Sequence, residues 1–333
     1  MNENSKSQGM MDTVKGFLSK SMILVALVVL CIIMGCLSTT FFTASNWLNI
    51  LVQSAINGII AVGMTFVIIT GGIDLSVGSI LAFSAVVGGL LLEAGIPVAI
   101  SVLVSIIIGS AAGFINGFFI TKFKMPAFIV TLAMMEICRG LTMVVTNGEN
   151  QSLTPDSSLA PKLSANYTAY SIFGGSLGGV FPVPIIIMFI VIIIGYYLLK
   201  YTTFGRGLYA IGGNREASKF SGIKVGKLEL LAYTITGLLC GIAGIVLNSR
   251  LGAAIPTAGE GYEMDAIGAV VIGGASLAGG EGSMGGTLIG VLILSVLNNG
   301  LNLMNVNSFY QDVVKGLVIL VAVLIDMLRK KNK

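Results

Sequence analysis

The sequence contains no histidine, only four cysteines and few charged residues, which occupy 10% of its 333 positions. All four cysteines, Cys31, Cys36, Cys138 and Cys240, lie inside apolar runs, where a thiol behaves as a small hydrophobic group. Their spacing is typical of neither a disulfide framework nor a metal site. No other spacing suggests a nucleophile, a metal cluster or a catalytic acid pair. We therefore expect no bound metal, no cofactor and no enzyme active site.

A phosphate-binding loop of the form G-x-x-x-x-G-K-[ST] is also absent from the sequence. The nearest segment, "GIKVGKL" (residues 222–228), has one residue too few between its glycines and no hydroxyl group after Lys227. We therefore expect no site for ATP hydrolysis on this chain. A process driven by ATP would need a separate ATPase chain.

Apolar residues, by contrast, occur in long runs. Hydrophobic residues make up 55% of the chain and the mean hydropathy is +0.95, well outside the usage of soluble proteins. Runs of roughly 20 residues match the thickness of a bilayer core. We predict an all-α membrane protein, a polytopic bundle of about ten transmembrane helices, at residues 21–37, 50–69, 76–92, 97–120, 127–145, 183–199, 228–247, 264–276, 285–303 and 313–328.

Lys and Arg in short loops predict the orientation of these helices. They occur in the amino segment, at Lys122 and Lys124, between the sixth and seventh spans, and in the tail. With ten spans these sites share one side, so both termini are predicted to be cytoplasmic, and the net charge of +4 needs no nucleic-acid partner. A cleaved signal peptide is the alternative for the first span, but no small-residue cleavage site follows Leu37. We expect a retained helix.

The spans are predicted to form a single membrane domain at residues 21–328. A cytoplasmic amino segment precedes it at 1–20, and a cytoplasmic tail follows at 329–333. Two longer connections interrupt the domain, an outer loop at 146–181 and a cytoplasmic loop at 200–227.

The cytoplasmic loop carries six basic residues and a single acid, Glu216. Asn214 can accept a hydrogen bond from a backbone N–H two or three residues later, and Glu216 suits the positive end of a helix. Gly222 suits a left-handed helix exit. The pattern predicts a short capped helix at residues 215–221.

An idle connector is the simplest interpretation of such a loop. This loop, however, contains two short elements that present small or aromatic side chains, Tyr209 and Ala210 in the first and Ala217 and Phe220 in the second. We favour a surface for docking another protein.

Four segments in the same order resemble one family of membrane proteins. "FGRGLYAIGGNREASKFSGIKV" is similar to the cytoplasmic coupling loop of the permease subunits of ATP-driven sugar importers. Glu216, Ala217 and Gly222 loosely fit the Glu-Ala-Ala…Gly pattern by which such permeases engage their ATPases. "GGIDLSVGS", "PTAGEGYEMDAIGAVVIGGASLAGGEG" and "LNNGLNLM" narrow the resemblance to the ribose-type branch, and it extends from about residue 41 to residue 326.

The resemblance implies a type II ABC importer-like permease of the bacterial cytoplasmic (inner) membrane. The implied partners are a separate, double-domain ABC ATPase subunit, an extracytoplasmic sugar-binding protein, and a second permease copy or close paralogue in the lipid bilayer. The implied substrate is a monosaccharide, first of all ribose, with galactose, xylose or a furanose-like signal as alternatives. The residues implied in coupling to the ATPase are Gly205, Arg206, Gly207, Tyr209, Ala210, Gly212, Asn214, Glu216, Ala217, Phe220 and Gly222.

The stretch "ITGGIDLSVGSI" places Asp74 among glycines in a long apolar run. Glycines do not favour a helix, and a helical run starts near Ser76, so the Asp74 carboxylate can cap free N–H groups at the start of a broken helix. Irregular backbone at membrane depth is tolerated where it is buried in protein or lines a cavity. We predict that Asp74 and Ser76 lie beside the translocation path or at its cytoplasmic mouth. A gating role and a proton-coupling role are the alternatives.

A second segment, "GGASLAGG" (residues 273–280), resembles this motif and has Ser276 where Asp74 stands. Since the second copy manages without a charge, capping is favoured over proton chemistry. Both copies are predicted on the cytoplasmic side, whereas an inverted repeat would place them on opposite sides.

Amides inside the spans are further candidates for the translocation path. Asn298 and Asn302 are four residues apart and share a helix face, with Asn299 beside them. Neutral amides can contact sugar hydroxyls without trapping the sugar, but hydrogen bonding between helices is an equal alternative. Asn57 and Asn116 are weaker candidates for the same role, because Asn116 lies in the small-residue pattern "GFINGFF".

The last candidates are charged residues near the ends of the predicted spans. Glu136 and Arg139 are three residues apart and predict an ion pair. Arg250, Glu260 and Glu263 are predicted on the outer loop between the seventh and eighth spans, either for docking the binding protein or as plain solvated charges. An ion-coupled secondary transporter is the rival function; it would need buried titratable groups, of which the sequence offers few.

Overall fold

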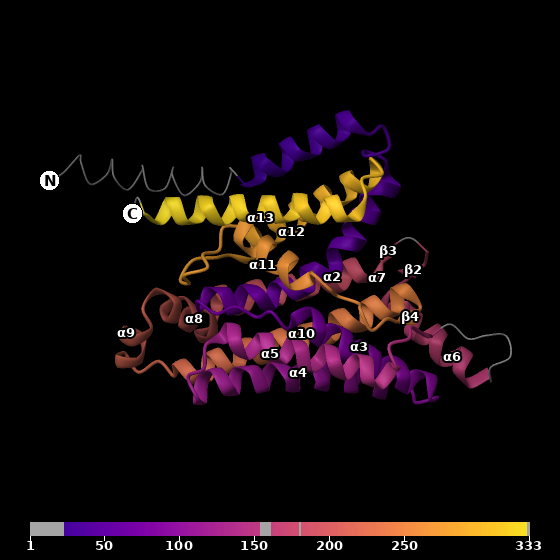
Figure 1. Cartoon of the computed structure of the whole chain (residues 1–333), viewed down its shortest axis with the longest axis horizontal. Coiled ribbons are helices and arrows are strands. Elements are labelled where there is room, and N and C mark those ends of the chain that lie inside the picture. Colours follow the sequence, from indigo (N-terminus) through magenta and orange to yellow (C-terminus); the bar gives the residue numbers. More distant parts are fainter. Residues whose placement is uncertain (1–22, 154–160, 180, 332–333) are drawn as a thin grey trace.

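The computed structural model describes residues 23–153, 161–179 and 181–331. The amino segment 1–20 and part of the outer loop 146–181 lie outside the described residues, as do the last two residues of the tail. In Figure 1 the long helices run side by side along the longest axis of the molecule. The short helices α8 and α9 lie at one end of this bundle and α6 lies at the other.

The described part of the chain is almost entirely helical. An apolar helix at Ile23–Leu37 comes first. The other helices are α2 (Ala44–Ile69), α3 (Val77–Glu93), α4 (Val98–Lys122), α5 (Ala127–Thr146), α6 (Pro161–Tyr170), the 3-10 turn η1 (Ser171–Phe173), α7 (Val183–Tyr201), α8 (Thr203–Gly213), α9 (Arg215–Phe220), α10 (Val225–Leu251), α11 (Tyr262–Ile272), α12 (Met284–Leu303) and α13 (Ser308–Lys331).

Within the described ranges, four two-residue strands lie in the connections. They form two antiparallel pairs, β1 (Gln151–Ser152) with β4 (Ala253–Ala254) and β2 (Ser176–Leu177) with β3 (Phe181–Pro182).

Each of the ten predicted spans overlaps a helix, although the span predicted at 264–276 extends beyond the end of α11 at Ile272, and the helical membrane architecture is confirmed. Six helices of the described chain are long and apolar enough to cross a membrane: α2, α4, α5, α7, α10 and α12. The helix at Ile23–Leu37 and α3 are apolar but shorter. The count of ten therefore stays a prediction.

The predicted boundaries err where polar residues continue a helix. α2 starts at Ala44, not at residue 50, and the hydroxyl of Thr43 accepts a hydrogen bond from the N–H of Asn46 at 3.3 Å. Hydropathy alone excluded Asn46 from the span, but tertiary contacts bury its side chain.

α2 and α10 form the centre of the bundle. In the most apolar window of α2, 83% of residues are buried, against 28% in α4. α10 packs on α4 through glycines, and a methyl group at Gly237 would lie only 2.9 Å from the Cα of Gly113. Such small-residue contacts let helix backbones approach closely in membranes, so the glycine pattern around Asn116 serves packing.

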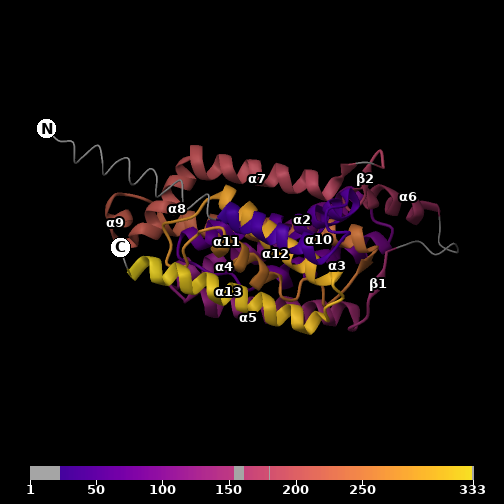
Figure 2. The same cartoon turned by 90° about the horizontal axis from the view of Figure 1, so that it is seen from above.

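The outer helices expose apolar side chains, as a lipid-facing surface requires. α7 and α13 lie on opposite flanks of the central helices in Figure 2, and both expose many large hydrophobic residues. The segments predicted to be cytoplasmic, namely the α8–α9 loop, the turn after α4 and the carboxyl end of α13, gather at one end of the molecule (Figure 1). We call this the inner end.

Candidate functional site

The short helix α9 has the predicted caps. The Asn214 carboxamide oxygen accepts a hydrogen bond from the N–H of Ala217 at 2.9 Å, and Gly222 adopts a left-handed φ of 81°. α9 ends at Phe220, one residue before the predicted end. Since every one of these contacts is local, the sequence pattern was sufficient to predict them.

The residues predicted for coupling divide into two groups. One group faces solvent, and the side chain of Phe220, 87% exposed, is its most prominent member. This exposed group consists of Arg206, Asn214, Glu216, Ala217, Phe220 and Gly222. The other group is buried or half-buried against the membrane helices and consists of Gly205, Gly207, Tyr209, Ala210 and Gly212.

The buried and half-buried group attaches the loop to the bundle by specific contacts. The Tyr209 hydroxyl donates to the carbonyl of Gly282 at 2.8 Å. Gly212 packs so closely on the opposite loop that a methyl group at Gly279 would lie 2.9 Å from its Cα. α8 is therefore in direct contact with residues 279–282.

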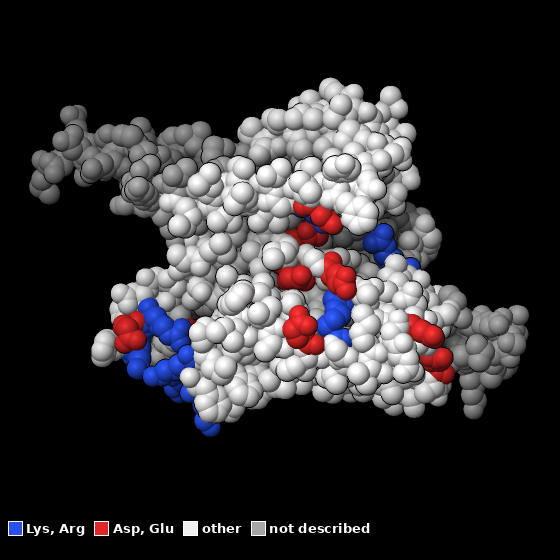
Figure 3. Space-filling view, in the orientation of Figure 1, with Lys and Arg blue, Asp and Glu red and all other residues white. Residues whose placement is uncertain are grey.

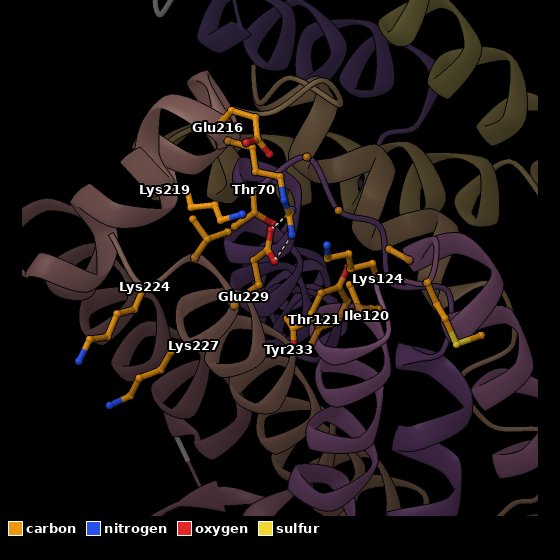
Figure 4. A pocket seen from close by; sticks show the side chains of 17 residues that line it. Thr70, Ile120, Thr121, Lys124, Glu216, Lys219, Lys224, Lys227, Glu229 and Tyr233 are labelled. Atoms are coloured by element: carbon orange, nitrogen blue, oxygen red, sulfur yellow. Dashed lines mark hydrogen bonds and ion pairs between the residues drawn. The ribbon is translucent and has the colours of Figure 1, made fainter. Parts of the chain in front are cut away.

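Arg215 of α9 forms a bidentate ion pair with Glu229 of α10, drawn with dashed lines in Figure 4. The Nη2–Oε2 distance is 2.8 Å, and Glu229 is a buried acid within a membrane helix. The sequence analysis missed Glu229. An acid just inside the start of an apolar span is a signal that could have found it.

The pair lies in a cavity of about 640 Å³ at the inner end. Its walls come from α9, the start of α10, the turn between α4 and α5, and the Thr70–Gly72 turn. In Figure 4 the side chains of Lys124 and Lys219 point into it, whereas Lys227 points away. A partly empty space thus separates α9 from the bundle, and the Arg215–Glu229 ion pair connects the two across it.

The two glycine-rich motifs meet at this end. The N–H of Gly280 donates to the carbonyl of Ile69 at 2.9 Å, and Gly71 and Gly279 both have left-handed φ values, 82° and 86°. Only glycine adopts this conformation without strain. The motifs therefore lie on the same side of the bundle, as the sequence predicts, and not on opposite sides as in an inverted repeat.

Asp74 is fully buried beside this contact. Its Oδ1 accepts hydrogen bonds from the N–H of Ser76 at 2.9 Å and from the Ser76 hydroxyl at 2.5 Å. The Asn116 amide donates to the same hydroxyl at 2.8 Å. The broken helix is confirmed, but the predicted cap is not: Asp74 binds the N–H of Ser76, one residue before α3, and this contact closes the turn without capping the helical N–H groups.

A tyrosine connects this turn to α10. The Tyr233 hydroxyl donates to the carbonyl of Ile73 at 3.4 Å. Tyr233 lies one helical turn beyond Glu229, so one face of α10 contacts both α9 and the turn that contains Asp74.

The predicted amides have different surroundings. Asn299 exchanges two hydrogen bonds of 2.9 Å with Asn46, which joins α12 to α2. Asn302 is exposed and accepts from the Gln311 side chain at 2.8 Å. The Asn298 carboxamide oxygen is buried and has no hydrogen-bond partner among the described residues. For Asn299 the structure shows the interhelical contact that was the alternative.

The predicted outer charges are not all on a loop. Glu260 lies in the α10–α11 connection, but Arg250 belongs to the last turn of α10 and Glu263 to the first turn of α11. Hydropathy ended the seventh span too early and began the eighth too late, because it treated Arg250 and Glu263 as loop residues.

The predicted Glu136–Arg139 ion pair is wrong. Arg139 donates to the carbonyls of Pro256 at 2.5 Å and Ala258 at 3.0 Å, while Glu136 is exposed and in no ion pair within the described ranges. The α10–α11 connection passes over α5 and presents these carbonyls to the guanidinium.

A further polar cluster was not predicted. It joins Asn57 of α2 to Asp265 of α11, Asp265 to Lys315 of α13, and Lys315 to Asp312 on the same helix. The signal was available, because Asp265 and Lys315 both interrupt apolar stretches, and ionisable residues inside membrane segments are functional suspects by default.

The chain is similar to known import permeases over most of its length. It is 47% identical over 313 residues to the ribose import permease protein RbsC of Escherichia coli (strain K12), covering 94% of this chain and 95% of the relative. It is 50% identical over 306 residues to the ribose import permease protein RbsC of Bacillus subtilis (strain 168), covering 92% and 91%.

A more distant relative is the xylose transport system permease protein XylH of Haemophilus influenzae, 37% identical over 345 residues and covering 88% of this chain and 91% of the relative. No solved structure gives a significant match. Residues 46–323 match the model of the family described as "Branched-chain amino acid transport system / permease component". The chain, with its helical membrane bundle and its capped loop at the inner end, therefore belongs to this family of transport permeases.

Proposed function

We propose that this chain is the transmembrane permease subunit of an ATP-binding-cassette importer that carries a monosaccharide, ribose, across the bacterial cytoplasmic membrane. The relatives named as ribose permeases are 45–50% identical to it, and those named as xylose permeases are 36–37% identical. This difference favours ribose and makes xylose the second candidate. Galactose or a furanose-like signal is a weaker alternative.

The observation that carries the proposal is the α8–α9 loop. It presents an exposed, capped helix at the inner end and is held to the membrane helices by buried contacts. A loop with this construction suits docking to a separate ATPase, and we assign no ATPase site to this chain. The other proposed partners are an extracytoplasmic sugar-binding protein and a second permease copy or close paralogue.

In this proposal Ala217 and Phe220 of α9 contact the ATPase, and the buried contacts carry its movement inward. Arg215 acts on α10 through Glu229, and Tyr209 acts on the 279–282 loop. Because Gly280 bonds to Ile69, these movements reach the turn that contains Asp74. We propose this turn, with Ser76 and Asn116, as part of the inner gate.

Asn57, Asn298, Asn299 and Asn302 stay proposed path residues, with the interhelical role now favoured for Asn299. Arg250, Glu260 and Glu263 stay proposed contacts for the binding protein. The termini are proposed to be cytoplasmic, because the carboxyl end of α13 lies at the same end as α9 (Figure 1).

Reconstitution tests the function. The chain would be placed in proteoliposomes with a sugar-importer ATPase and a sugar-binding protein from the same organism, and uptake of labelled ribose, xylose and galactose would be measured. We expect uptake of ribose that needs both ATP and the binding protein. Uptake driven by an ion gradient without ATP would support a secondary transporter instead, and preference for another sugar would reassign the substrate.

A further inference from the structure

Three helices bring polar side chains together away from the inner end. Asn57 lies about halfway along α2, and Lys315 lies two turns from the start of α13, at the end of the bundle opposite α9. Asp265, in the first turn of α11, lies between them. Charged groups at this depth in an apolar bundle are costly and are rarely kept without a role.

The contacts within this cluster are loose. The Asn57 amide donates to Asp265 Oδ2 at 3.4 Å, and Lys315 Nζ is 3.8 Å from Asp265 Oδ1. Both are longer than the usual 2.7–3.2 Å for an N–H···O hydrogen bond. Among the described residues, the one short contact of the cluster is between Lys315 and Asp312, 2.8 Å, and Asp312 has a side chain that is 69% exposed.

The cluster therefore has unused hydrogen-bonding capacity. The Asn57 carboxamide oxygen has no partner among the described residues. Lys315 carries three N–H donors, of which one makes a short contact to Asp312 within the described chain. Asp265 is buried with two long contacts. A ligand with hydroxyl groups can replace or supplement each of these contacts.

A purely structural ion pair between α11 and α13 explains the cluster less well. The two helices already pack directly, because a methyl group at Gly268 would lie 2.7 Å from Ile319 Cγ1. A pair that served only to join them would gain most from a short, well-aligned bond.

The cluster is also accessible. The Lys315 side chain is 21% exposed. Figure 3 shows acidic and basic side chains gathering along a hollow between the layer that holds α13 and the layer that holds α4 and α5. Tyr262, half-buried, lies three residues before Asp265 on the same side of α11 and offers an aromatic ring beside the cluster.

We propose that Asn57, Asp265 and Lys315 form a binding site for the hydroxyl groups of the monosaccharide during its passage, with Tyr262 against the sugar ring. A neutral polyol suits this set, because each of its hydroxyls both donates and accepts, whereas the mixed charges disfavour a simple cation or anion. The site rests on the proposed function, and it adds a sugar contact in the permease between the outer end and the middle of the membrane.

The test compares single and double neutral variants, Asp265→Asn, Lys315→Met and the two combined. Each is reconstituted with the ATPase and the binding protein, and sugar uptake, ATP hydrolysis and the amount of assembled complex are measured together. Glu149→Gln, at an exposed outer acid away from the cluster, is the control. Uptake by the wild-type complex in the same assay tests the proposed function separately.

We expect Asp265→Asn to lower the sugar imported per ATP hydrolysed by about tenfold, the effect of losing a charge-assisted hydrogen bond, while assembly and stimulated ATP hydrolysis persist. The double variant discriminates between the two roles. It leaves no unpaired buried charge, so a structural pair would be restored by it, whereas a sugar site would not. Recovery of uptake to within about twofold of wild type, or failure of the double variant to assemble, would overturn the proposal.

Discussion

The inner end and the cluster of Asn57, Asp265 and Lys315, which we call the outer polar cluster, both contain buried carboxylates, but the contacts of these carboxylates differ in length. At the inner end Arg215 forms a bidentate ion pair with Glu229, and Asp74 accepts two hydrogen bonds from Ser76, at 2.9 and 2.5 Å. In the outer cluster the two contacts of Asp265 measure 3.4 and 3.8 Å.

The difference follows from what each region has to do in the proposed transport cycle. A contact that transmits a rigid-body movement must keep its geometry, so short and directional bonds suit it. A site that receives and releases a ligand must exchange partners, so long contacts that a ligand can replace suit it. The comparison predicts that changes which break contacts at the inner end reduce sugar uptake strongly, and that changes elsewhere reduce it less.

The largest expected effect is from Ala217→Trp. Ala217 is exposed on α9, where a large side chain prevents a close fit to the ATPase without disturbing the bundle. We expect loss of the ATPase from the complex, or ATP hydrolysis without uptake, in a normally inserted chain. Copurification and coupled uptake measure this, with Asn150→Trp at the exposed outer end as the matched control. Wild-type values of both quantities would return the loop to the status of a connector.

Charge reversal at Arg215 should have the next largest effect. Arg215→Glu places a second carboxylate against the buried Glu229, and solvent screens part of the repulsion because the Arg215 side chain is 52% exposed. We expect uptake to fall by about tenfold, with ATPase binding retained because Arg215 faces α10.

The double variant Arg215→Glu with Glu229→Arg should restore much of the uptake, since it rebuilds the pair in reverse. No rescue, or no loss in the single variant, would mean that the pair does not transmit movement. Uptake and copurification of the ATPase are the measurements for both variants.

The amides of α12 should separate structural from path roles. Asn299→Leu removes the buried pair with Asn46, which costs about 0.6–2 kcal/mol in a membrane, so we expect less assembled complex. The double change of Asn298 and Asn302 to Leu should slow uptake and leave assembly intact. Membrane abundance and uptake rate distinguish them, and the reverse pattern would exchange the two assignments.

The smallest effect is expected from Asp74→Asn. The amide oxygen still accepts from the N–H of Ser76, so most transport should persist, whereas Asp74→Leu leaves that buried N–H unpaired at a cost of about 1–3 kcal/mol. Uptake at matched membrane abundance is the measurement. Complete loss of uptake in the Asn variant would show that the charge itself acts, as in the gating or proton-coupling alternative.

The sequence by itself determined the local features. The apolar runs match helices in every predicted span, and the α9 caps at Asn214 and Gly222 form as predicted. The glycines around Gly71 also predicted the break in the helix. These features depend on hydropathy and on hydrogen bonds between residues a few positions apart, so the information lies within short windows of the chain.

Only the tertiary structure decided which distant residues meet. Asn46 and Asn299 are 253 positions apart, Asn57 and Asp265 are 208 apart, and Arg215 finds Glu229 on the next helix. Arg139 illustrates the limit: spacing favoured Glu136, but the folded chain brings the carbonyls of another segment closer. Helical spacing predicts which residues can share a face, whereas a polar group in an apolar bundle bonds to the partner that helix packing brings within reach.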